Sequence, residues 1–187
     1  MRGRLGGYNS TVADHLAYFV TLSAYGDRVH GDERGSVDRR RNVIDEPRLD
    51  HDPRREDRER ALLKFPPMRF TSEIRNAIEE SFAETCTFRG WLLLAIHCRT
   101  NHVHCVLSTP EVATSEVLHR LKSRATRALR AAGLVEPDQS VWSRHGSTRI
   151  LWTDDDVAAA IDYTLNHQGA DLPGTGVWRE LHQPGEE

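Results

Sequence analysis

The sequence has no hydrophobic run that approaches the roughly 20 residues needed to cross a membrane. Its longest apolar segment runs from Trp91 to Ile96 and has the length of a β-strand. The N-terminus carries basic residues without an apolar stretch behind them, so it does not resemble a secretory signal. We therefore expect a cytoplasmic protein that makes no contact with a membrane.

Cysteine is scarce, because the 187 residues include only Cys86, Cys98 and Cys105 and no Cys-x-x-Cys pair. An odd number without regular spacing argues against a disulfide framework. Free thiols are among the side chains most often buried in protein cores. We therefore expect these three cysteines to be reduced and mostly buried.

An excess of positive charge is also missing, because 25 Lys and Arg residues stand against 28 Asp and Glu residues. The formal net charge of -3 argues against a protein that binds nucleic acid over its whole surface, but it leaves room for local basic patches. No internal repeat is present, and the length suits one ordinary domain. We therefore expect a single domain over residues 1–187.

Hydrophobic periodicity predicts the order strand, helix, hairpin, helix, strand, helix. In chain order, the predicted segments are a strand over Leu16–Leu22, a helix after Thr71, a hairpin of Phe88–Cys98 and Val103–Leu107, a helix over about Thr114–Ala132, a strand over Ser147–Trp152, and a helix over about Asp154–Gln168. This order is typical of an α+β fold with an antiparallel sheet. Residues 26–60 are charged and poor in large apolar side chains, which indicates a surface insertion with a short helix near Glu56–Leu63. We expect residues 171–187 to form a loose tail.

Two histidines that alternate along a predicted strand are the sharpest chemical signal. His102 and His104 project from one face of this strand, whereas Val103 and Cys105 project from the other. The pattern leaves two interpretations open, namely two imidazoles offered to a common ligand or two polar residues on a solvated face. A zinc site built from Cys98, His102, His104 and Cys105 is disfavoured, because Cys105 points away from the histidines.

The last predicted helix carries a tyrosine away from its apolar stripe. This stripe consists of Val157, Ile161 and Leu165. At about 100° per residue, Tyr163 lies about 160° from the centre of the stripe, and His167 lies on the same side as Tyr163. Gln168 lies about 140° from Tyr163 and fits their shared face poorly. We therefore expect the helix to offer Tyr163 and His167 to one site, the alternative for Tyr163 being an ordinary surface aromatic.

The segment Asn101–Leu107 resembles the HUH motif, in which a bulky hydrophobic residue separates two histidines. It is most similar to the motif of the single-tyrosine HUH transposases, and especially of the REP-associated tyrosine transposases. Further segments look like the first strand, the helix after the motif and the stretches that lead to the nucleophile in that family. These segments are Tyr18–Thr21, Leu121–Ser123, Trp142–Arg144 and Ile161–Tyr163. The resemblance covers most of the chain and implies a ferredoxin-like antiparallel sheet with packed helices.

The resemblance also implies a single-stranded DNA endonuclease and strand-transferase. In that family the two motif histidines, here His102 and His104, bind a divalent cation, Mg²⁺ or Mn²⁺. A helical tyrosine, here Tyr163, attacks phosphorus and forms a 5'-phosphotyrosine intermediate. Many relatives carry Gln or Asn four residues after the tyrosine as a further metal ligand, and His167 occupies that position in this sequence. A third imidazole suits Mn²⁺ or a later transition metal better than Mg²⁺, which prefers oxygen ligands.

The implied partner is single-stranded or hairpin DNA, bound by a monomer or a homodimer through local basic patches. The candidate DNA-binding residues are Arg120, Lys122, Arg124, Arg127, Arg144 and Arg149. The first four lie on one predicted helix, where they could hold phosphates or simply form a solvated face. The last two lie near Trp142 and Trp152, whose rings suit either base stacking or the core.

Two other functions remain open at this point. A domesticated copy of the fold could bind nucleic acid without catalysis, and its binding would then be insensitive to a chelator and to Tyr163→Phe. A hydrolase could use the three histidines to activate a metal-bound water, and hydrolysis would then survive loss of the phenol.

Overall fold

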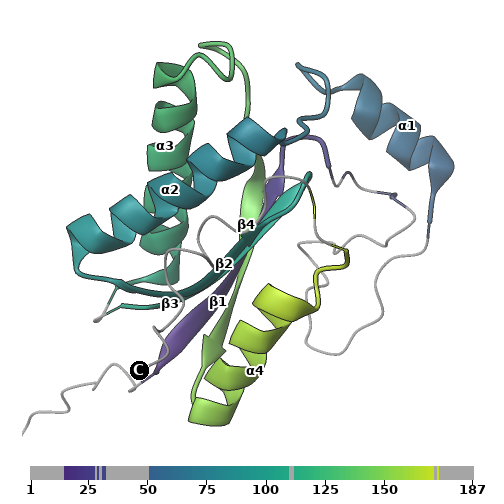
Figure 1. The fold of residues 1–187 in the computed structure, drawn as a ribbon. Helices are drawn as coiled ribbons and strands as arrows, with labels where there is room; N and C mark the ends of the chain where they lie inside the picture. The colour runs from purple at the N-terminus through teal and green to yellow at the C-terminus, as the bar shows by residue number, and fades with distance from the viewer. Residues whose placement is uncertain are drawn as a thin grey trace, which may run out of the picture.

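The computed structural model describes residues 15–27, 29, 31–32, 51–109, 112–170 and 172. Within these residues the chain forms four strands and four helices (Figure 1). In chain order they are β1 (Ala17–Ala24), α1 (Pro53–Ala61), α2 (Ser72–Arg89), β2 (Leu92–Cys98), β3 (His102–Ser108), α3 (Thr114–Ala131), β4 (Trp142–Leu151) and α4 (Asp154–Asn166). Residues 33–50 of the predicted insertion, and all of the predicted tail except Leu172, lie outside the described residues.

The four strands form one sheet in the order β2-β3-β1-β4, and every neighbouring pair is antiparallel. The predicted α+β fold with an antiparallel sheet is therefore confirmed. The two central strands, β3 and β1, pair so that Thr21 lies opposite His104 and Phe19 lies opposite Val106. Cross-strand partners share a face of the sheet, so this register decides which side chains meet.

Helices cover both faces of the sheet. Figure 1 shows α2 and α3 side by side on one face and α4 alone on the other, with α1 to one side. Three of these helices begin with side-chain caps, and in α1 the carboxylate of Asp52 accepts from the backbone N–H of Arg55. The hydroxyl of Thr71 accepts from the backbone N–H of Ile74 at the start of α2, and Thr153 and Asp156 form a reciprocal capping box at the start of α4.

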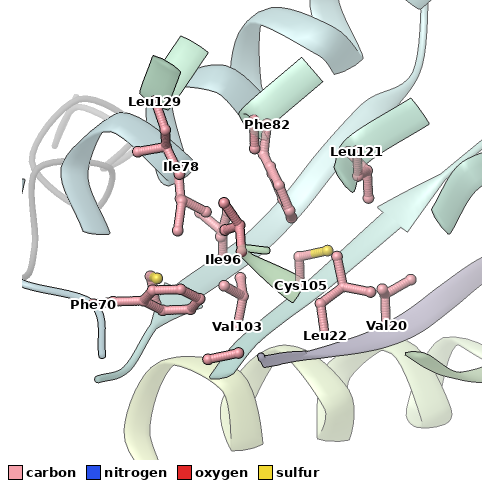
Figure 2. Packing of buried hydrophobic residues seen from close by; sticks show 14 of the residues in the cluster. Val20, Leu22, Phe70, Ile78, Phe82, Ile96, Val103, Cys105, Leu121 and Leu129 are labelled. Carbon is pink, nitrogen blue, oxygen red and sulfur yellow. The ribbon is translucent and has the colours of Figure 1, made fainter. Parts of the chain in front are cut away.

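The larger core lies between the sheet and the helices α2 and α3. Alternate residues of the strands point into it, including Val20 and Leu22 from β1 and Val103 and Cys105 from β3 (Figure 2). The helices contribute fully buried apolar side chains such as Phe82 in α2 and Leu121 and Leu129 in α3. This layer therefore carries most of the apolar burial in the described chain.

A smaller core lies between the opposite face of the sheet and α4. Its buried members are Ala17, Ala95, Val106, Leu151 and Ala160. Three of these five are alanines, so the helix lies on a layer of small side chains. The half-buried side chains of Phe19, Val157, Ile161 and Leu165 complete this layer.

Several predicted boundaries are wrong in detail. Phe88 was predicted to open the hairpin, but α2 continues to Arg89 and ends at Gly90, whose φ of 67° is left-handed. The last strand begins at Trp142, five residues before its predicted start. In α3 the buried row has a regular spacing of four residues and consists of Val117, Leu121, Ala125 and Leu129.

The three cysteines are free and buried, as the sequence predicts. Burial raises the pKa of the Cys86 thiol to about 12 and holds the pKa of Cys98 and of Cys105 well above the ordinary range. No helix among the described residues combines the length and apolar character that crossing a membrane requires.

Candidate active site

The histidine pair lies on the α4 side of strand β3. The imidazole rings of His102 and His104 have centroids 4.6 Å apart and planes inclined by 72°. Their neighbours Val103 and Cys105 belong to the core on the opposite face, so the alternation predicted from the sequence is confirmed. The site therefore lies on the same face of the sheet as α4.

Each imidazole is held by a side chain outside the pair. Thr21 lies directly opposite His104 on β1, and its Oγ1 is 2.9 Å from Nδ1 of His104. The amide oxygen Oδ1 of Asn101 is 2.8 Å from Nδ1 of His102. In both residues the Nδ1 atom contacts the protein, which orients the two rings.

Tyr163 of α4 joins this cluster through its ring. Its centroid lies 5.7 Å from that of His104 and 5.9 Å from that of Phe19, in edge-on arrangements. Phe19 in turn stacks on His104, with centroids 5.1 Å apart and planes inclined by 12°. The tyrosine side chain is 46% exposed, so the phenol is open to solvent while its ring touches the histidine.

The inner face of α4 is rotated relative to the predicted stripe. The helix buries Ala160 and Thr164, whereas Val157, Ile161 and Leu165 are only half-buried. The centre of the buried face thus moves toward Tyr163, which lies at its edge rather than on the far side. This rotation explains how a partly exposed tyrosine can still contact a side chain of the sheet.

Gln168, and not the predicted His167, lies beside the histidine pair. His167 was expected to share the site, but its Nε2 lies 2.8 Å from Oδ2 of Asp162, and both side chains are exposed. The Oε1 atom of Gln168, which was expected to fit poorly, is 3.4 Å from Nε2 of His102. The helical period cannot be extended to these positions, because α4 ends at Asn166 and His167 leaves the helix with φ -116° and ψ 26°.

Two contacts hold Gln168 in this place. Its Nε2 donates to the backbone carbonyl of Tyr163 at 3.0 Å, which leaves its Oε1 facing His102. Two residues further on, the carbonyl of Ala170 accepts from Nη1 of Arg99 at 2.6 Å, which ties the end of α4 to the β2–β3 turn. Hydrogen bonds from Asn166 and, to a smaller extent, from His167 hold the pKa of Asp162 below its ordinary value.

A third histidine supports the helix from the sheet. His97 lies opposite His104 on β2, is buried, and has its Nδ1 3.2 Å from the backbone carbonyl of Thr164. Thr164 directly follows Tyr163 in α4. His97 therefore connects the sheet, next to His104, with the turn of α4 that carries Tyr163.

The chemistry of these donors fits a divalent cation, with two imidazoles and one amide oxygen gathered together. The described residues contain no cluster of three or more His, Cys, Asp or Glu side chains suited to an ion, so the amide of Gln168 is needed to complete a set of three. Cys105 belongs to the opposite core, and burial keeps its thiol protonated, so the zinc site disfavoured by the sequence is not formed.

Of the candidate DNA-binding residues, Arg149 lies beside Phe19 of this cluster. It lies opposite Phe19 on β4, with its guanidinium carbon 5.9 Å from the centroid of the Phe19 ring. Arg120, Arg124 and Arg127 are exposed on α3, which covers the other face of the sheet.

The remaining candidate residues have diverse surroundings. Lys122 donates to the carbonyls of Ser143 and His145 at 2.8 and 3.1 Å, and partial burial lowers its pKa. Arg144 is exposed on β4. Trp142 contacts the large core and donates to Thr126, whereas Trp152 is half exposed. Trp152 therefore remains open to base stacking, and Trp142 does not.

Sequence reasoning missed Phe19, Thr21 and Gln168. A signal for the first two exists, because Tyr18, Val20 and Leu22 form an alternating apolar row that leaves Phe19 and Thr21 on the other face. No local pattern indicates Gln168, since its place depends on where α4 ends.

Residues 66–155, just under half of the chain, match the family model described as "Transposase IS200 like". This stretch includes the histidine pair and ends before Tyr163. No curated protein matches the chain significantly.

Two solved structures are similar to this one. A REP-associated tyrosine transposase bound to a REP hairpin has a TM-score of 0.52 at 13% identity, covering 95% of this chain and 86% of that chain. A putative transposase from Deinococcus radiodurans R1 has a TM-score of 0.44 at 16% identity, covering 91% of this chain and 99% of that chain. The chain thus has the fold of a REP-associated tyrosine transposase, and the resemblance stated from the sequence is confirmed.

Proposed function

We propose that this chain, with its IS200-like transposase segment, is a single-stranded DNA endonuclease and strand-transferase whose nucleophile is Tyr163. The observation that carries the proposal is the edge-on contact between the rings of Tyr163 and His104, with centroids 5.7 Å apart. The histidine pair and the tyrosine come from β3 and α4 of the same chain. One chain therefore brings the histidine pair and the tyrosine together.

The reaction is an exchange at phosphorus. The phenol oxygen of Tyr163 attacks a DNA phosphodiester and forms a new P–O bond, while the bond from phosphorus to the 3' oxygen breaks. The phenol loses its proton and the departing 3' oxygen gains one, so the products are a free 3'-hydroxyl and a 5'-phosphotyrosine. Attack by another 3'-hydroxyl reverses the step and joins two strands without nucleotide hydrolysis.

We propose that His102, His104 and the Oε1 atom of Gln168 hold a divalent cation, with Gln168 in the place first expected for His167. Such an ion supplies positive charge that offsets the charge developing on the phosphate oxygens. Phe19 packs against both His104 and Tyr163 and keeps the two rings in contact. An oxygen ligand in place of a third imidazole makes Mg²⁺ as suitable as Mn²⁺.

The DNA partner is single-stranded or hairpin DNA. The similar REP-associated transposase is bound to a REP hairpin, and Arg149 lies beside the aromatic cluster of this chain, where it can contact a phosphate. We assign the basic residues of α3 a secondary role, because that helix covers the face of the sheet opposite His104.

A covalent-adduct assay tests the proposal. The full-length protein is incubated with labelled single-stranded DNA containing an imperfect hairpin, with Mn²⁺ or Mg²⁺, and analysed on a denaturing gel. We expect a protein–DNA adduct that Tyr163→Phe reduces by at least about a hundredfold while DNA affinity is retained, because only the attacking oxygen is lost. A chelator should also abolish the adduct.

Tyr25→Phe is the matched control, because the Tyr25 hydroxyl accepts from the N–H of Lys64 and its ring packs on Phe65, away from the histidines. Adduct formation that survives Tyr163→Phe would overturn the proposal. DNA binding without any adduct, insensitive to chelator, would favour a non-catalytic binding module. Cleavage that needs metal but not the phenol would favour a hydrolase.

A further inference from the structure

A buried carboxylate lies two contacts away from the histidine pair. Asp27 is in the turn that follows β1, with only 5% of its surface exposed. Its Oδ1 accepts from Nδ2 of Asn101 at 2.8 Å, and Oδ1 of Asn101 is 2.8 Å from Nδ1 of His102. These contacts link residues that are 74 positions apart in the sequence.

The direction of these hydrogen bonds follows from what each atom can do. A carboxylate only accepts, so the amide nitrogen of Asn101 must face Asp27 and the amide oxygen must face His102. Nη1 of Arg69 donates to the same Asp27 oxygen at 3.4 Å. Because an amide oxygen also only accepts, Nδ1 of His102 must carry the proton.

This assignment decides where His102 presents its lone pair. A neutral imidazole with its proton on Nδ1 has its lone pair on Nε2. That atom lies 3.4 Å from Oε1 of Gln168, which carries lone pairs of its own. Since both of these atoms are acceptors, they cannot form a hydrogen bond with each other, but they can both coordinate one cation.

We propose that Asp27 is a positioning residue, which acts through Asn101 to keep the proton of His102 on Nδ1 and the lone pair of Nε2 directed at the cation site. The metal part of this inference rests on the proposed function. The tautomer part stands independently, because it concerns only contacts within the described chain.

The backbone around this relay is held separately from the side chains. The carbonyl of Asn101 accepts from the N–H of Ala24 at 2.8 Å, and the carbonyl of Thr100 accepts from the N–H of Phe70 at 2.8 Å. A change at Asp27 that preserves side-chain shape should therefore leave the turn in place. What it changes is the rotation of the Asn101 amide about its last side-chain bond.

The test is histidine-ring NMR on the metal-free, full-length protein at a pH at which His102 is neutral. Two-bond ¹H–¹⁵N correlations distinguish the two tautomers, and the His102 signals are those absent from His102→Gln. We expect the Nδ1–H tautomer in the wild-type protein. In Asp27→Asn the side chain at position 27 is no longer restricted to accepting hydrogen bonds, so Asn101 can present either its oxygen or its NH₂ group to His102, and we expect the Nε2–H tautomer to appear beside the Nδ1–H form.

Two further variants keep the test decisive. Asp32→Asn is the matched control, because Asp32 is an equally buried aspartate in the same region that approaches Arg60, and it should leave the tautomer unchanged. The double variant Asp27→Asn with Asn101→Asp reverses the amide and the carboxylate, and should restore the Nδ1–H form. An Nε2–H tautomer in the wild type, or Nδ1–H as the sole tautomer in Asp27→Asn, would overturn the proposal.

Mn²⁺ affinity, measured by electron paramagnetic resonance without DNA, tests the metal part. We expect Asp27→Asn to weaken Mn²⁺ binding by about 10- to 100-fold, as is usual when an outer-shell partner of a metal-binding histidine is lost. The double variant should recover most of this loss, and Asp32→Asn should show none. Equal affinity in Asp27→Asn and the wild type would refute the metal part. Neither measurement involves Tyr163. Failure of Tyr163 as the nucleophile can therefore be distinguished from failure of the role proposed for Asp27.

Discussion

The two faces of the sheet carry side chains of different polarity, although the same strands form both. Toward α2 and α3, strand β3 directs Val103 and Cys105 into a large apolar core. Toward α4 it directs His102 and His104, beside a smaller core made mostly of small side chains. The face toward α2 and α3 therefore supplies most of the stability, and the face toward α4 accommodates polar groups. Single substitutions on each face can separate these two contributions.

The largest expected effect comes from neighbouring positions on β3. His104→Ala should reduce adduct formation by at least about a hundredfold, because it removes an imidazole of the proposed cation site and the ring that Tyr163 contacts. Val103→Ala should leave the activity per folded molecule unchanged but lower the free energy of unfolding by roughly 2 kcal/mol, through lost burial and a cavity. The adduct assay and urea unfolding measure the two effects. Equal loss of activity in both variants would erase the distinction between the faces.

The second prediction compares the helices on the two faces. Leu121→Ala in α3 should lower the free energy of unfolding by about 2–5 kcal/mol, because Leu121 is fully buried in the large core. Ile161→Ala in α4 should cost clearly less, because Ile161 is only half-buried. Urea unfolding of both variants checks the order, and a larger loss for Ile161→Ala would show that the small core carries the stability.

The periodicity of the sequence predicted part of the candidate site correctly. The strand period placed His102 and His104 together on one face and Cys105 on the other, because alternation holds wherever a strand continues. The helical period placed Tyr163 approximately, although the buried row of Ala160 and Thr164 is less apolar than the stripe first chosen. Because the buried residues of α4 are small or polar, hydrophobic periodicity did not identify the inner face of this helix.

Other parts of the site depend on structure that no local pattern encodes. Gln168 takes the place expected for His167 because α4 stops at Asn166, and the stop was predicted two residues too late. Asp27 meets Asn101 only because the β1 turn and the β2–β3 turn come together in the folded sheet. Pairings of this kind follow from strand order and register, which the sequence alone left undetermined.

The smallest expected effect concerns DNA contact on the two faces. Arg149→Gln should weaken binding of single-stranded DNA and reduce the slope of log affinity against log salt by about 0.7, the value for one phosphate contact. Arg127→Gln, on the exposed side of α3, should change the slope less, because this helix covers the face opposite the histidines. Fluorescence anisotropy over a salt series measures both. A larger change for Arg127→Gln would place the DNA path across α3, as the basic residues of that helix first indicated.

The alanine layer under α4 has a consequence for how the site could diverge among related sequences. Ala17 and Ala95 from the sheet and Ala160 from the helix pack in the same small cluster, so their methyl groups set how close the helix approaches the strands. A bulkier residue at any of the three would push α4 outward and carry the hydroxyl of Tyr163 away from the imidazoles. The distance between the proposed nucleophile and the histidines is therefore set by positions that bear no reactive group, and a comparison of motifs alone would overlook substitutions there.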